Sequence, residues 1–139
     1  MLTRKIGRLS NIYSKIDNPR ASVYANYIQN SNVKVTGNII IEGKGAYNSI
    51  LEAGGDVKIT GLPGVFRGGR IKAGKAVIVR ELGSIGGSRV DVQVDADGRI
   101  AAERVFDNVF INIGGRLLVL NKEMRNINAR LDHNGQIIF

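Results

Sequence analysis

One segment of the chain resembles a nucleotide-binding loop. Residues Gly69 to Lys75 fit the first seven positions of the G-x-x-x-x-G-K pattern that cradles phosphates, but Ala76 stands where Ser or Thr would hold Mg²⁺. That loop leaves a strand and opens a helix, whereas Ile71 to Val79 reads as strand, corner and strand. We therefore interpret these glycines as corner residues, and we predict no cofactor and no small-molecule substrate.

An acidic group resembles part of a calcium loop. Asp91, Asp95 and Asp97 precede a glycine, but with Asp97 at position 5 the residues at positions 1 and 12 are Gln93 and Arg104. The loop would lose two of its carboxylates. The segment is better interpreted as a tight turn, and we predict no metal site.

Catalytic chemistry based on cysteine or histidine has little support. The chain has no cysteine, which excludes thiolate nucleophiles, disulfides and cysteine-based zinc sites. Its one histidine, His133, lies in the polar turn Asp132 to Gly135. The outward positions of the predicted first strands offer one carboxylate, which is too few for a paired acid and base: Lys34, Glu52, Lys72, Gln93, Asn112 and Arg130. We therefore predict no catalytic residues and no enzymatic activity.

The chain is basic, with 20 Lys+Arg against 12 Asp+Glu and a formal charge of +8, half of it within residues 1–20. A second concentration of cations has no acid between its members and forms a candidate basic surface: Arg67, Arg70, Lys72, Lys75 and Arg80. Phe66 is the one aromatic ring nearby, whereas single-strand binders interleave several. We therefore interpret this surface as solvated, and we do not expect it to bind nucleic acid.

A repeated unit organises most of the 139 residues. LEAGGDVKI, from Leu51, has three alternating residues, a glycine corner and three more alternating residues. Equivalent units start at residues 33, 71, 92, 111 and 129, with spacings of 18 to 21 residues. A period of this kind indicates stacked turns that bury one continuous core, because no turn could bury its apolar face alone. We predict an all-β parallel solenoid of six coils over residues 21–139.

The same template predicts which side chains point inward. Alternation places one face of each strand in the core. The predicted core includes Leu51, Val57, Ile59, Ile71, Val77, Val79, Ile111, Ile113, Leu117 and Val119.

Residues 1–20 differ from the repeats. Ile6, Leu9, Ile12 and Ile16 are three or four residues apart and are interleaved with cations, a pattern typical of an amphipathic helix. We predict a helix over residues 1–16, followed by a linker. No run approaches the roughly 18 apolar residues of a spanning helix, so a cytoplasmic protein is expected.

One outward row of the predicted solenoid is apolar. The middle residues of the second strands are Ile40, Lys58, Ile78, Ala101, Leu118 and Ile138, so five of the six are apolar. A continuous apolar stripe marks an interface. We expect either a second subunit or the apolar side of the helix over residues 1–16 to cover it, and the second subunit is favoured. Residues 136–139 carry no charge to block an incoming strand, so stacking at that end is also expected.

Residues 20–139 resemble a known family. The stretches YANYIQNSNVKVTGNIIIEGKGAYNSILEAGGDV and PGVFRGGRIKAGKAVIVRELGS, with their ordered glycine corners, are similar to the C-terminal part of the flagellar assembly protein A family of bacteria. The resemblance implies a right-handed single-stranded β-solenoid, often preceded by a coiled coil, and brings no catalytic residues with it. Bactofilin-like filament formers share this architecture.

Together these features favour a non-enzymatic structural or interaction module. We expect a homo-oligomer or a protein partner, with a link to cell-envelope, cytoskeletal or flagellar assembly. The alternative is a surface-binding module whose basic N-terminal segment docks on anionic lipid or nucleic acid. A steep loss of binding with salt would distinguish that alternative.

Overall fold

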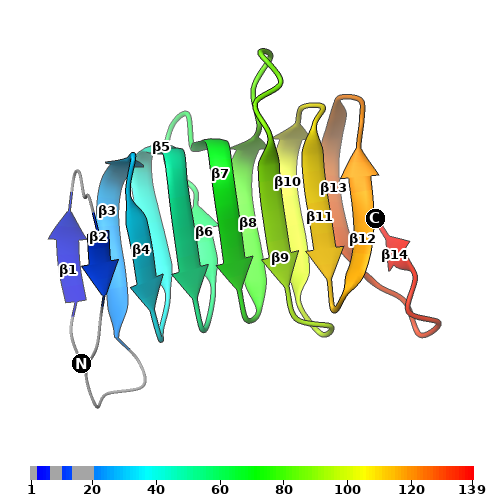
Figure 1. Ribbon diagram of the computed structural model, residues 1–139, viewed down its shortest axis with the longest axis horizontal. Helices are drawn as coiled ribbons and strands as arrows, with labels where there is room; N and C mark the ends of the chain where they lie inside the picture. The colour runs from blue at the N-terminus through cyan, green and yellow to red at the C-terminus, as the bar shows by residue number, and fades with distance from the viewer. Residues whose placement is uncertain (1–2, 7–10, 14–20) are drawn as a thin grey trace.

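The computed structural model describes residues 3–6, 11–13 and 21–139, and these contain strands and no helix. Figure 1 shows the strands stacked side by side along the long axis, from blue at one end to red at the other. The strands are β1 (Thr3–Ile6), β2 (Asn11–Tyr13), β3 (Ser22–Gln29), β4 (Asn32–Val35), β5 (Ile39–Ala53), β6 (Val57–Ile59), β7 (Val65–Ala73), β8 (Ala76–Leu82), β9 (Val90–Val94), β10 (Arg99–Val105), β11 (Val109–Ile113), β12 (Arg116–Leu120), β13 (Met124–Leu131) and β14 (Ile137–Ile138).

Two parallel ladders form the walls of a β-solenoid of about five turns. The front ladder runs through β2, β4, the end of β5, β7, β9 and β11. The back ladder runs through β1, β3, the start of β5, β6, β8 and β10. The first residues of five predicted units are cross-strand neighbours in one buried row: Val33, Leu51, Ile71, Val92 and Ile111. This row confirms the predicted alignment of these units.

The core fills the space between the ladders. Eight of the ten predicted core residues are at most 2% exposed: Leu51, Val57, Ile59, Ile71, Val77, Val79, Ile111 and Ile113. The prediction is wrong for Leu117, which is 70% exposed, and for Val119, which is 47% exposed. Their neighbour Leu118, expected to face outward, packs against the core instead.

A chain reversal causes this error. Gly114 and Gly115 have φ of +57° and +91°, as in the two-residue turns that close β-hairpins, and β12 runs antiparallel to β11. Strand β13 is then antiparallel to β10, and β14 is antiparallel to β13. The units starting at residues 33, 51, 71 and 92 therefore form coils as predicted. The units starting at 111 and 129 do not, because their corners turn the chain back on itself.

The helix predicted over residues 1–16 is wrong for the described residues of that segment. Thr3–Ile6 form β1, which pairs with β3, and Asn11–Tyr13 form β2, which pairs with β4. The edge of the first complete turn offers unpaired backbone groups, and pairing with them outweighs the helical spacing of the apolar residues. The other residues of the predicted helix lie outside the described part.

A left-handed residue marks the corner before the front-ladder part of β4, β5, β7 and β11. Asn30, Asn48, Gly68 and Asn108 all have positive φ at equivalent places in their turns. Asparagine and glycine adopt this conformation at the lowest cost. The recurrence of these residues was the sequence signal for this corner, and the repeat template did not include it.

Candidate interaction surfaces

The back sheet carries three of the five candidate interface residues in one row. Ile40, Lys58, Ile78 and Ala101 are cross-strand neighbours, and each is half-buried. The next place in the row belongs to Asn128 of β13. The other two candidate residues lie elsewhere: Leu118 faces the core from the front sheet, and Ile138 lies opposite Arg130 in the terminal hairpin. The stripe is therefore shorter than the sequence predicted.

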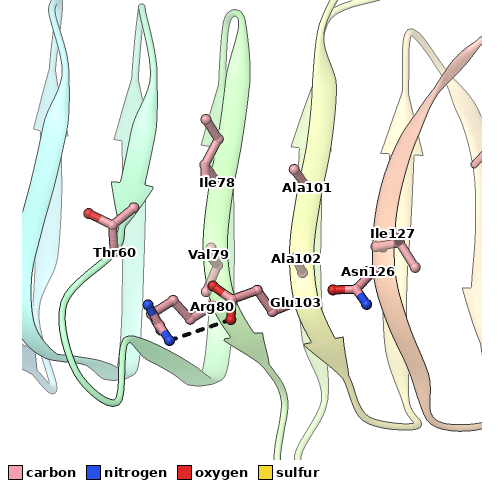
Figure 2. Close-up of a pocket in the computed structure, with 9 residues that line it drawn as sticks. All are labelled: Thr60, Ile78, Val79, Arg80, Ala101, Ala102, Glu103, Asn126 and Ile127. Carbon is pink, nitrogen blue, oxygen red and sulfur yellow. Dashed lines mark ion pairs between the residues drawn. The ribbon is translucent and has the colours of Figure 1, made fainter.

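A groove of about 510 Å³ lies along this row (Figure 2). Ile78 and Ala101 contribute its apolar floor, and Thr60, Arg80, Glu103 and Asn126 also line it. Ala101 is a short side chain beside a longer isoleucine, which hollows the surface at that point. The groove thus offers an apolar site with charged groups beside it.

An ion pair holds the charged side of the groove. Arg80 Nη2 lies 3.4 Å from Glu103 Oε1, and both side chains are more than a third exposed. A pair in contact with water adds little to folding stability. Its charged groups remain accessible to solvent beside Ile78 and Ala101.

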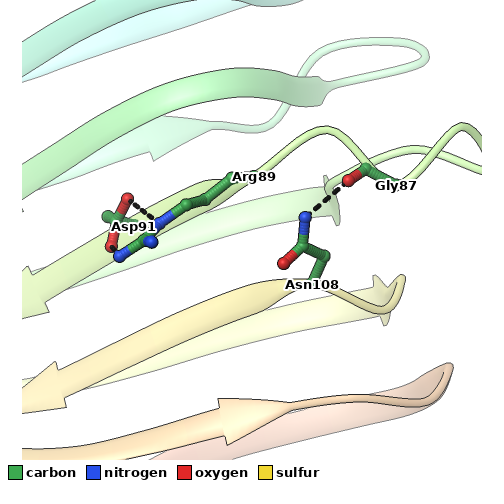
Figure 3. Close-up of polar contacts among 4 residues, drawn as sticks. All are labelled: Gly87, Arg89, Asp91 and Asn108. Atoms are coloured by element: carbon green, nitrogen blue, oxygen red, sulfur yellow. Dashed lines mark hydrogen bonds and ion pairs between the residues drawn. The ribbon is translucent and has the colours of Figure 1, made fainter.

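A second polar cluster lies on the front sheet, towards the C-terminal end (Figure 3). Arg89 donates two hydrogen bonds to the Asp91 carboxylate, at 3.0 and 3.1 Å, and these bonds raise the pKa of the guanidinium. The Arg89 guanidinium carbon also lies 3.9 Å from the ring centre of Phe110. The guanidinium thus lies over the ring of Phe110, which is the cross-strand neighbour of Val119 in β12.

The loop between β8 and β9 is held to the next turn by one side chain. Asn108 Nδ2 donates a hydrogen bond of 2.6 Å to the Gly87 carbonyl, as Figure 3 shows. Ile85 of this loop is 84% exposed. Figure 1 shows the loop rising above the neighbouring corners.

The candidate basic surface is spread around one turn of the solenoid. Arg70 and Lys72 belong to the front ladder, where they neighbour Asp91 and Gln93 respectively. Arg67 lies earlier in β7, Lys75 occupies the following corner, and Arg80 belongs to the back ladder. The five cations are therefore distributed over the front ladder, a corner and the back ladder.

The glycines of the nucleotide-loop-like segment have a structural role. Gly69 has a φ of +118°, and an added Cβ would collide with the Ser49 carbonyl of the preceding turn. A Cβ on Gly74 would likewise meet the Gly54 carbonyl. Both positions allow close stacking of neighbouring turns.

The two acidic segments form the predicted turns. Gly98 N donates to the Asp95 carbonyl at 2.9 Å, and Gly135 N donates to the Asp132 carbonyl at 3.0 Å. His133 is exposed in the second turn. Across the described residues, no group of three or more His, Cys, Asp or Glu side chains could hold a metal ion.

Apolar exposure is concentrated at the C-terminal end. The described part of the chain has six exposed large apolar side chains. Leu62 and Ile85 lie in loops, and the other four lie in β12 and the C-terminal tail: Leu117, Val119, Ile138 and Phe139.

The repeat, the glycine corners and the single-chain stacking of turns agree with a family comparison. A family model described as the Flagellar Assembly Protein A beta solenoid domain matches residues 6–102, which is more than half of the chain. The chain belongs to the flagellar assembly protein A family. Comparisons with curated proteins and with solved structures each gave no match.

The flagellar assembly protein A match ends within β10. The hairpins β11–β12 and β13–β14, which close the C-terminal end, therefore lie outside the matched segment. Within the described residues, no helix combines the length and hydropathy needed to cross a bilayer.

Proposed function

We propose that this flagellar assembly protein A solenoid is a non-enzymatic scaffold that acts in the cytoplasm and associates with itself through its back sheet. The supporting observation is the groove floored by Ile78 and Ala101 beside the Arg80–Glu103 ion pair. Half-buried apolar side chains flanked by polar ones are typical of the centre and rim of a protein interface.

The solenoid suits this role because its surface is held rigid. Strands β6, β8 and β10 are each paired on both sides, so the groove is built on hydrogen-bonded backbone. A contact with such a surface loses little conformational entropy on association. A second copy can place an apolar side chain over Ala101 and meet the charges of Arg80 and Glu103.

The test compares two substitutions in the same row. Ile78→Glu places a charge on the floor of the groove, whereas Lys58→Glu changes a neighbour that is already charged. We expect light scattering to show a mass above the monomer for the wild type and for Lys58→Glu, and a lower mass for Ile78→Glu. A wild type that is monomeric throughout, or an Ile78→Glu variant that keeps the wild-type mass, would refute the proposal.

A further inference from the structure

Strand β12 is an open edge of the front sheet. Among the described strands it pairs with β11 alone. Opposite residues of an antiparallel pair alternate between hydrogen-bonded and non-hydrogen-bonded, and the pair that flanks a two-residue turn is hydrogen-bonded. Here that pair is Ile113 with Arg116. The peptide groups of Leu117 and Val119 consequently point away from β11, towards the open side.

The outward side chains also change character at this edge. One cross-strand row on the outer front face is polar in five successive strands and apolar in the sixth: Lys34, Glu52, Lys72, Gln93, Asn112 and Leu117. Natural edge strands are protected from pairing by charges, prolines or bulges. Strand β12 has exposed Leu117 and Val119 instead, and Ile138 and Phe139 are exposed at the same end.

We propose that β12 pairs antiparallel with β12 of a second copy, about a two-fold axis that passes midway between Leu118 and its equivalent. This inference rests on the proposed self-association and adds a second contact to it. In this register the free peptide groups of Leu117 form hydrogen bonds with those of Val119 of the second copy. The free peptide groups of Val119 form the same bonds with Leu117 of the second copy. A two-fold contact of this kind is self-complementary.

The charges of β12 fit this register. Its one charged residue, Arg116, falls opposite Leu120 of the second copy, so no two arginines face each other across the axis. Arg116 Nε donates a hydrogen bond of 2.9 Å to the Gly135 carbonyl, which holds the side chain towards the tail of its own copy. Like charges directly opposite would destabilise a strand pair, and this register avoids them.

The pairing also covers partly buried apolar side chains at the C-terminal end of the core. Leu118, Leu131 and Ile137 are partly buried and pack against the core from its last turn. Leu118 would meet its own equivalent across the axis, which removes further apolar surface from water. A five-residue strand with a short tail falls below the ~800 Å² per partner of a standard interface. The dimer is therefore weak and depends on protein concentration.

The first experiment uses the absence of cysteine from the chain. Across the proposed axis, Leu118 and its equivalent form a non-hydrogen-bonded pair, whose Cα atoms lie about 4.5 Å apart, within the range of disulfides. We expect Leu118→Cys to form a disulfide-linked dimer under mild oxidation at least tenfold faster than Ile85→Cys, which measures random collisions from an exposed loop. Equal rates for the two variants would overturn the proposal.

The second experiment measures dimerisation by sedimentation equilibrium. Leu117→Lys places a charge on the edge strand, and Gln93→Lys places one in the same row on an interior strand. We expect Leu117→Lys to weaken end-on association at least tenfold and Gln93→Lys to leave it unchanged. Each copy carries a formal charge of +8, so added salt should strengthen the dimer.

The variants Ile78→Glu and Leu117→Lys distinguish the back-sheet contact from the end-on pairing. Loss of association in Ile78→Glu but not in Leu117→Lys would overturn the end-on pairing and leave the proposed back-sheet contact standing. Loss in Leu117→Lys alone would support the end-on pairing and refute the back-sheet contact. Weakening of the dimer by salt would also contradict the end-on pairing.

Discussion

Leu118 lies opposite Ile111 across the β11–β12 hairpin and shares its inward side, so Leu117 next to it is turned to solvent. The repeat template predicts that Leu51 and Leu117 both point into the core. Leu51 is fully buried, whereas Leu117 is 70% exposed.

Truncation of these two leucines should therefore differ in cost. We expect Leu51→Ala to lower the free energy of unfolding by about 2–5 kcal/mol, because it leaves a cavity in a close-packed core. Leu117→Ala should change it by no more than about 0.5 kcal/mol. Denaturant unfolding at low protein concentration measures both values without a contribution from association. Equal costs would mean that Leu117 is buried and that the hairpin register is wrong.

The reversal at the C-terminal end shows where prediction from the sequence stopped. Gly54-Gly55 and Gly114-Gly115 are the same dipeptide in equivalent places of the template. Only the second pair has positive φ at both residues. Glycine adopts either sign of φ at similar cost, so the local sequence does not determine whether the chain continues or turns back.

The same difference between continuing and reversing corners explains which candidate interface residues lie in one row. Ile40, Ile78 and Ala101 were placed in one row correctly because each follows a corner that continues the solenoid. Leu118 and Ile138 were misplaced because each follows or lies within a hairpin. At the other end, the helical spacing of Ile6 and Ile12 predicted a helix, but both residues lie in strands paired with the first complete turn.

The left-handed corner gives a second prediction. Asn48 has a φ of +49°, and its side chain is exposed. Asn48→Gly should leave the free energy of unfolding nearly unchanged, whereas Asn48→Ala should lower it by about 1 kcal/mol, because alanine pays the steric cost of this conformation. Thermal and denaturant unfolding of the two variants provides the comparison. If alanine is tolerated as well as glycine, the corner does not require a left-handed residue.

A third prediction concerns acid. The hydrogen bonds from Arg104, at 3.2 Å, lower the pKa of the Glu123 carboxyl, and the charges of Arg104 and Arg125 lower it further. A carboxyl with a lowered pKa in the folded state stabilises the fold above its unfolded pKa, and this stabilisation is lost as pH falls through the folded pKa. Glu123→Gln should therefore melt at a lower temperature than the wild type at neutral pH.

In acid the two melting temperatures should converge, because protonation removes the same charge from the wild type. Melting curves recorded from neutral pH down to about pH 3 measure the difference between them. The melting curves of Glu103→Gln provide a comparison, because this variant also removes one carboxylate from an ion pair on the same sheet, the pair with Arg80. A difference for Glu123→Gln that stays constant across the range would contradict an electrostatic origin.

The last prediction concerns the loop between β8 and β9. Within the loop, Gly87 N donates to the Ser84 carbonyl at 2.9 Å, and Asn108 Nδ2 binds the Gly87 carbonyl from the next turn. Asn108→Gly keeps a residue that tolerates positive φ and removes the side-chain donor. A lost hydrogen bond of this kind costs about 1 kcal/mol, so local opening of the loop should become about fivefold more frequent. Hydrogen exchange of residues 84–88 measures the opening directly.

Asn48→Gly makes the same backbone change at an equivalent corner and should leave this exchange unchanged. Faster exchange in both variants would assign the effect to the corner backbone, and unchanged exchange in Asn108→Gly would show that the hydrogen bond from Asn108 does not hold the loop.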